Sequence, residues 1–209
     1  MELNNKRFIS YGSHNNECYI IIYYEKNNQY SEDYNFNIGN CNCYRNIQII
    51  QIKENEICYL ILKEKGYEKK YYLFLCFFDL LERKQLKEIE ICLNEHNPII
   101  MNMVTKDLLL IAHWNSFFLI NLDQYNIIRQ IEVEKNNYNS YFTCLCLLSK
   151  NMFLTGDSKG AIKQWKIEGN EITLFSSKHI AHNGGITTIL KLGEGRILSC
   201  GWSDGFKIW

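Results

Sequence analysis

Three residues near the end of the chain are of the types that catalyse acyl transfer. Ser199 could act as the nucleophile, His182 as the general base and Asp204 as the carboxylate that orients the imidazole. The sequence has no nucleophile-elbow motif, no glycine-rich phosphate loop and no pair of metal-spaced histidines. A hydrolase is therefore one hypothesis, and the place of these residues in a repeated segment favours a structural role instead.

The chain has nine cysteines, four of which form two closely spaced pairs. Zinc sites usually space a cysteine pair by two to four residues within a turn. Cys41 and Cys43, like Cys144 and Cys146, are separated by one residue, which in a strand puts both sulfur atoms on one face. We expect the later pair in the core, the earlier pair in a loop, and neither a metal nor a cofactor.

Charge and cysteine usage also restrict the partners and the compartment. Lys plus Arg and Asp plus Glu both number 23, so net charge provides no attraction to nucleic acid or to anionic lipid. No segment approaches the roughly 18 apolar residues of a membrane span. An odd cysteine count behind a polar N-terminal segment indicates free thiols in a reducing compartment. The sequence predicts an intracellular, cytoplasmic protein, with the nucleus left open.

The segment that contains Ser199 and Asp204 belongs to a repeat. Residues 196–209 predict a strand, a tight turn at Asp204-Gly205 and a second strand of β-prone residues. Similar segments recur 44 residues apart. The matching positions are Leu110, Leu154 and Leu198, then Thr155 and Ser199, Lys163 and Lys207, and Trp165 and Trp209. A period of this length made of short strands is typical of the blades of a β-propeller.

At these positions the sequence resembles the WD40 repeat family. The resemblance is carried by Ala181-His182 in place of the usual Gly-His, by Leu198-Ser199, by Asp204-Gly205 and by Lys207-Ile208-Trp209. It is clear over residues 98–209 and weaker upstream. It implies an all-β fold, a β-propeller of WD40 type built of four-stranded blades.

We expect a single propeller domain over residues 1–209, with blade units at roughly 1–40, 41–97, 98–138, 139–182 and 183–209. The first unit lacks an innermost strand and the last an outermost one, which predicts a partial or open ring. The asparagine-rich residues 25–45 are expected to form a loop insertion between blades. Residues 80–94 contain strong helix formers, but the repeat predicts a turn and an outer strand over 85–92. Asp79 and Asp123, 44 residues apart, are expected just past equivalent third strands.

WD40 blades often contain a hydrogen-bonded set of Asp, His, Ser or Thr, and Trp. The resemblance assigns to this set, in the last blade, His182, Ser199, Asp204 and Trp209. The preceding blade keeps Thr155 and Trp165, but Tyr138 takes the histidine position and Asp157 is out of register. The complete network is therefore predicted for one blade, and the other blades are expected to depend on packing alone.

Trp114, Ser158 and Trp202 also stand 44 residues apart, each at the turn between a second and a third strand. We expect the two tryptophans to present aromatic surface to a protein partner on one rim, the alternative being that each ring packs on a neighbouring blade. The resemblance implies a non-catalytic scaffold for protein–protein interaction, with no small-molecule substrate. The alternative is a regulatory or substrate-recruiting subunit or domain of an enzyme or RNA-processing assembly.

Overall fold

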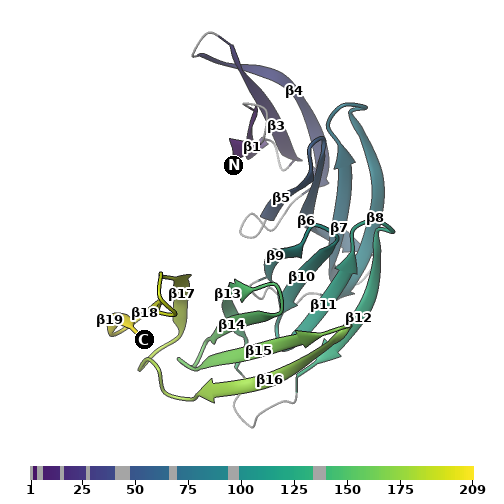
Figure 1. Cartoon of the computed structure of the whole chain (residues 1–209). Coiled ribbons are helices and arrows are strands. Elements are labelled where there is room, and N and C mark those ends of the chain that lie inside the picture. Colours follow the sequence, from purple (N-terminus) through teal and green to yellow (C-terminus); the bar gives the residue numbers. More distant parts are fainter. Residues whose placement is uncertain are drawn as a thin grey trace. The chain divides into compact units, whose positions relative to one another are not determined.

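The structure is a computed structural model of the chain. It describes all residues except 1, 4–6, 15–16, 27–28, 41–47, 66–69, 94–98 and 134–139. The described residues form an all-β fold of antiparallel sheets with three or four strands each (Figure 1). Within them, no helix could span a membrane. The chain divides into two compact units, Met1–His96 and Asn97–Trp209.

The first unit contains two four-stranded sheets, each with its strands in chain order. The first sheet consists of β1 (Glu2–Leu3), β2 (Arg7–His14), β3 (Glu17–Lys26) and β4 (Gln29–Asn40). The second sheet consists of β5 (Gln48–Lys53), β6 (Glu56–Lys65), β7 (Lys70–Asp79) and β8 (Lys84–Leu93). Ile20 and Ile22 of β3 pack with Ile57 and Ile61 of β6 in one buried cluster. The burial of these aliphatic faces holds the two sheets together.

Two predictions for the first unit are wrong. The first sheet does have an innermost strand, because β1 pairs with β2 through Glu2↔Phe8 and Leu3↔Arg7. Much of the predicted loop over 25–45 is the outer strand β4, which pairs with β3. An outer strand pairs on one edge only and can tolerate many polar side chains, so its asparagines hid the strand pattern.

The segment with strong helix formers is a strand, β8, as the repeat predicts. It pairs with β7, for example through Leu75↔Ile89. The turn before it is closed by Asp79, whose Oδ1 accepts the backbone N–H groups of Leu81 and Glu82, both at 2.8 Å. Tertiary pairing therefore outweighs helix propensity, which amounts to only some tenths of a kcal/mol per residue.

The second unit contains three sheets. The third sheet consists of β9 (Ile99–Thr105), β10 (Leu108–His113), β11 (Ser116–Asn121) and β12 (Asn126–Glu132). The fourth consists of β13 (Phe142–Ser149), β14 (Met152–Asp157), β15 (Ile162–Glu168) and β16 (Glu171–Lys178). The fifth has three strands, β17 (Ile186–Lys191), β18 (Ile197–Gly201) and β19 (Gly205–Ile208). Within this unit the fourth sheet lies between the other two (Figure 1).

Two apolar clusters join these sheets. An aromatic cluster lies between the third and fourth sheets, where the ring of Phe117 lies 4.7 Å from that of Phe142 and 5.0 Å from that of Trp165. An aliphatic cluster joins the fourth sheet to the fifth and includes Leu154 and Ile186. The sheets thus pack face to face, as the repeat predicts for neighbouring blades.

The 44-residue period is visible in the strand register. Leu110, Leu154 and Leu198 take the same place in the second strand of their sheets. Their partners in the first strand are Asn102, Cys146 and Leu190, which are again 44 residues apart. The three leucines therefore occupy equivalent positions.

The predicted match of Asp79 with Asp123 is wrong by two residues. At the turn after β11, Asn121 makes the bonds that Asp79 makes after β7. Its Oδ1 accepts the N–H groups of Asp123 at 2.9 Å and of Gln124 at 2.8 Å. Asn121 is the counterpart of Asp79, because an amide oxygen can close this turn as well as a carboxylate can.

Candidate functional site

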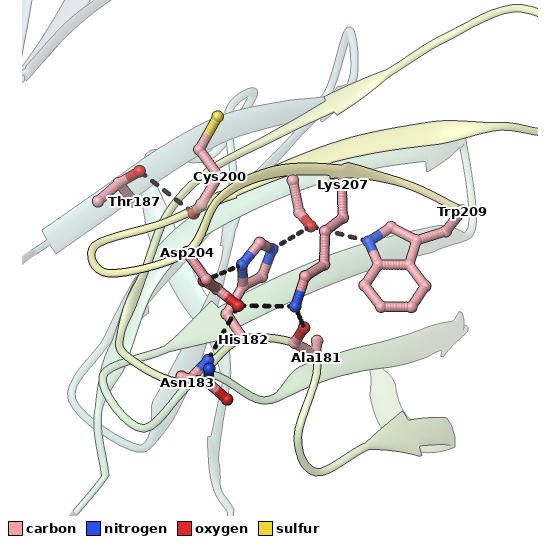
Figure 2. Close-up of polar contacts among 9 residues, drawn as sticks. Ala181, His182, Asn183, Thr187, Cys200, Asp204, Lys207 and Trp209 are labelled. Carbon is pink, nitrogen blue, oxygen red and sulfur yellow. Dashed lines mark hydrogen bonds and ion pairs between the residues drawn. The ribbon is translucent and has the colours of Figure 1, made fainter.

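A chain of hydrogen bonds joins the four predicted side chains of the fifth sheet. His182 lies in the loop before β17, Ser199 in β18, Asp204 in the turn before β19 and Trp209 just after β19. The distance from His182 Nδ1 to Asp204 Oδ1 is 2.6 Å, and from His182 Nε2 to Ser199 Oγ it is 2.7 Å. Trp209 Nε1 donates to Ser199 Oγ at 2.8 Å. Figure 2 shows the imidazole held between the turn and the strand.

The donors and acceptors of this network are complementary. Because the indole N–H donates to Ser199 Oγ, the serine hydroxyl can donate to Nε2 of a neutral His182, whose Nδ1–H then donates to Asp204. This proton assignment follows from the donor inventory of the side chains. Every polar atom of the buried imidazole is thereby paired, which removes the cost of burying it.

Asp204 is also the acceptor for a lysine and for the loop. Its Oδ2 accepts from Lys207 Nζ at 2.6 Å and from the backbone N–H of Asn183 at 3.2 Å. Donation by the Lys207 ammonium, followed by donation from His182, lowers the pKa of the Asp204 carboxyl to about 2 against the opposing effect of burial. Lys207 Nζ donates in addition to the Ala181 carbonyl at 2.8 Å. These bonds fasten the loop before β17 to the turn before β19.

The Ser–His–Asp geometry is that of a hydrolase triad, but its serine is closed off. Ser199 and His182 have 0% and 1% of their surface exposed. The Ser199 oxygen already bonds the indole of Trp209 and the imidazole of His182. A nucleophile must contact its substrate. The arrangement therefore suits a structural role, in which hydrogen bonds hold the loop, the strand and the turn together, better than catalysis.

The fourth sheet contains a polar network of its own, which corrects the prediction that packing alone stabilises the remaining blades. Trp165 Nε1 donates to Thr155 Oγ1 at 2.8 Å, in the same way as Trp209 to Ser199. Asp157 Oδ1 accepts the backbone N–H of Ala161 at 2.9 Å, and its Oδ2 lies 3.8 Å from Lys163 Nζ.

Asp157 and Lys163 are the members of this second network that the sequence did not reveal. Both are buried, and Lys163 stands 44 residues before Lys207. The match between Lys163 and Lys207 was the signal in the sequence that could have revealed an acidic partner, because a buried lysine needs an anionic partner. Asp157 provides it from the end of β14, whereas Asp204 provides it from within the turn. Tyr138, the predicted replacement for the histidine, lies outside the described residues.

The three predicted rim residues lie in corresponding turns but have different surroundings. Trp114 is half-buried, and its ring stacks on Tyr141, which directly precedes β13, with 5.8 Å between ring centres and 21° between planes. Ser158 Oγ accepts the N–H of Tyr141 at 3.2 Å. Trp202 is 83% exposed. Trp114 therefore packs on the neighbouring sheet, which was the alternative prediction. Trp202 has the exposed aromatic ring that was expected.

A pocket of about 290 Å³ opens beside Trp202, between the fourth and fifth sheets. The residues that line it are Tyr141, Thr143, Ser158, Gly185, Ile186, Thr187 and Trp202. Two of the three predicted rim residues, Ser158 and Trp202, thus border one hollow. Trp114 reaches it only through its contact with Tyr141.

Six cysteines whose side chains the structure describes are free thiols: Cys18, Cys58, Cys76, Cys144, Cys146 and Cys200. Cys144 and Cys146 border the aliphatic cluster of the fourth and fifth sheets, and burial raises the pKa of the Cys144 thiol to about 11. Cys41 and Cys43 lie outside the described residues. In the part of the chain that the structure describes, no three His, Cys, Asp or Glu side chains are grouped to hold a metal ion.

No protein-family model matches the sequence, and no curated protein matches it significantly.

Proposed function

We propose that the protein is a non-catalytic scaffold of WD40 propeller type, which binds other proteins through the turn-bearing rim around Trp202. The single observation that carries the proposal is the 83% exposure of this tryptophan beside a pocket. Exposing a large aromatic ring to water is unfavourable, and buried tryptophans are among the strongest contributors at protein interfaces. The rim therefore has the form of an interface whose partner supplies the missing contacts.

The hydrogen-bond networks support this function by making the rim rigid. The turn that carries Trp202 also carries Asp204, which is tied to His182, Lys207 and Asn183. A surface held in place before binding loses less conformational entropy when a partner docks. The WD40 assignment is supported by the recurring register of the three sheets in the second unit and by the His182–Ser199–Trp209 set.

A partner-capture experiment with two matched variants tests the proposal. Trp202→Ala removes the exposed indole, and Phe206→Ala removes another exposed ring, 70% accessible, from the same sheet outside the pocket. We expect the Phe206→Ala protein to retain the partners of the unaltered protein, as identified by mass spectrometry. The Trp202→Ala protein should lose them, with an unchanged melting temperature because its side chain has little packing to lose.

Either of two results would contradict the proposal. The first is equal partner recovery by both variants, which would remove Trp202 from the interface. The second is labelling of Ser199 by a serine-directed covalent probe on the folded protein, which would favour the hydrolase alternative. The identity of a captured partner would also decide the regulatory-subunit alternative, because an enzyme or RNA-processing factor would then be recovered.

A further inference from the structure

We propose that the pocket beside Trp202 receives one bulky, uncharged side chain of the partner protein, either aromatic or branched aliphatic. This inference rests on the proposed function and adds to it the chemistry of the residue that is recognised. It is argued from the residues of the pocket wall, their charges, their hydrogen bonds and the size of the hollow.

The wall contains no group that would attract an ion. Tyr141, Ile186 and Trp202 supply its large side chains, and the remaining residues are threonine, serine and glycine. The nearest carboxylates of the two networks are engaged elsewhere: Asp157 with Lys163, and Asp204 with Lys207. A charged side chain entering this pocket would lose hydration without gaining a counter-ion. The absence of charged groups on the pocket wall therefore favours an uncharged occupant.

Several polar groups of the wall are paired within the protein, but the Thr143 hydroxyl oxygen is buried without a hydrogen-bond partner among the described residues. Ser158 and Tyr141 exchange two bonds, one to the serine hydroxyl at 3.2 Å and one from the serine N–H to the tyrosine carbonyl at 2.9 Å. The Thr187 hydroxyl donates to the Cys200 carbonyl at 3.2 Å, and the Gly185 carbonyl accepts the N–H of Trp202 at 3.0 Å. Apart from the unpaired Thr143 hydroxyl, the pocket therefore offers mainly apolar contact.

The size of the hollow is sufficient for one bulky side chain. A cavity of roughly 150 Å³ is large enough to bind benzene, and this one measures about 290 Å³. It therefore has ample room for one ring or one branched aliphatic group, with the Trp202 indole at its edge available to cover it. The backbone of the partner would remain outside, against the rim.

Small aromatic probes of different charge test this inference on the full chain. Toluene, benzylammonium and phenylacetate share a ring but are neutral, cationic and anionic. Each would be titrated into isotope-labelled protein while the amide signals of Gly185, Thr187 and Trp202 are followed by NMR. We expect toluene to shift these signals and to bind at least about tenfold more tightly than either ion, since desolvating an unpaired charge is costly.

Variants locate the binding site. Trp202→Ala should weaken toluene binding roughly tenfold, as expected for the loss of a large aromatic contact with the occupant. Phe206→Ala, outside the pocket, should leave toluene binding unchanged. Thr187→Trp should fill the hollow from its exposed edge and abolish the shifts. Circular dichroism of each variant ensures that a lost signal reflects the pocket and not unfolding.

Three outcomes would overturn the inference. They are no specific shift with any probe, binding of benzylammonium or phenylacetate as tight as that of toluene, or toluene binding that is the same in the Trp202→Ala protein. These outcomes are independent of partner capture. If the pocket binds toluene as expected while no partner depends on Trp202, the proposed function fails and the pocket chemistry stands.

Discussion

Replacing Ser199 by alanine should destabilise the protein by about 2–4 kcal/mol. The change removes the acceptor of the Trp209 indole N–H, at 2.8 Å, and the partner of His182 Nε2, at 2.7 Å. A buried polar group left without a partner costs about 1–3 kcal/mol. The imidazole side chain has 0% exposure and should bear the full cost. The indole is only partly buried, so water can replace some of its lost bond.

The free energy of unfolding, measured by urea denaturation with circular dichroism, checks this magnitude. The chain itself provides the control, because Thr155 bonds the Trp165 indole 44 residues earlier in the same way. Ser199→Thr keeps the hydroxyl and should be clearly less destabilising than Ser199→Ala. Thr155→Val breaks one bond instead of two and should cost about 1–3 kcal/mol. Equal losses for Ser199→Ala and Ser199→Thr would refute the reasoning, since the hydroxyl would then contribute nothing.

Two further changes test the bonds around the same loop. The Asp204 pKa is lowered from 3.8 to about 2, so its ionisation stabilises the fold above pH 4, and this contribution is lost as the pH falls toward 2. Acid titration of stability should therefore show a smaller decrease over this interval in Asp204→Asn than in the unaltered protein; equal decreases would contradict it. Gly160→Ala should cost at least about 2 kcal/mol, because φ is +87° and a Cβ would lie 2.2 Å from the His182 carbonyl oxygen. Gly193→Ala, where a Cβ meets no neighbour, is the control, and similar melting temperatures for the two variants would oppose the argument.

The part of the fold that could be predicted from the sequence is the part that repeats. Apolar residues at fixed spacing predicted the strands of the second unit and the strand β8, against its local helix propensity. The outer strand β4 and the short strand β1 were missed. An outer strand can carry polar side chains, and a two-residue strand is too short to show alternation, so neither leaves the apolar pattern on which the prediction depended.

The residues of the candidate site could be predicted from the sequence only where they occupy positions of the 44-residue repeat. His182, Ser199, Asp204 and Trp209 could be named because each side chain sits at a repeat position. The pair of Asp157 and Lys163 was missed because the carboxylate reaches the lysine from the end of a strand, out of register with Asp204. Side-chain reach allows several sequence positions to serve one site, and a fixed spacing cannot anticipate which is used.

The sequence by itself determined the strand repeat and the identity of the residues in the network of the fifth sheet. Only the tertiary structure decided what those residues can do. Ser199 has the partners of a nucleophile, yet its burial closes it to substrate. Trp114 and Trp202 are equivalent in the repeat, but Tyr141 covers the first and a pocket borders the second. Exposure depends on neighbours distant in sequence, and no local pattern contains them.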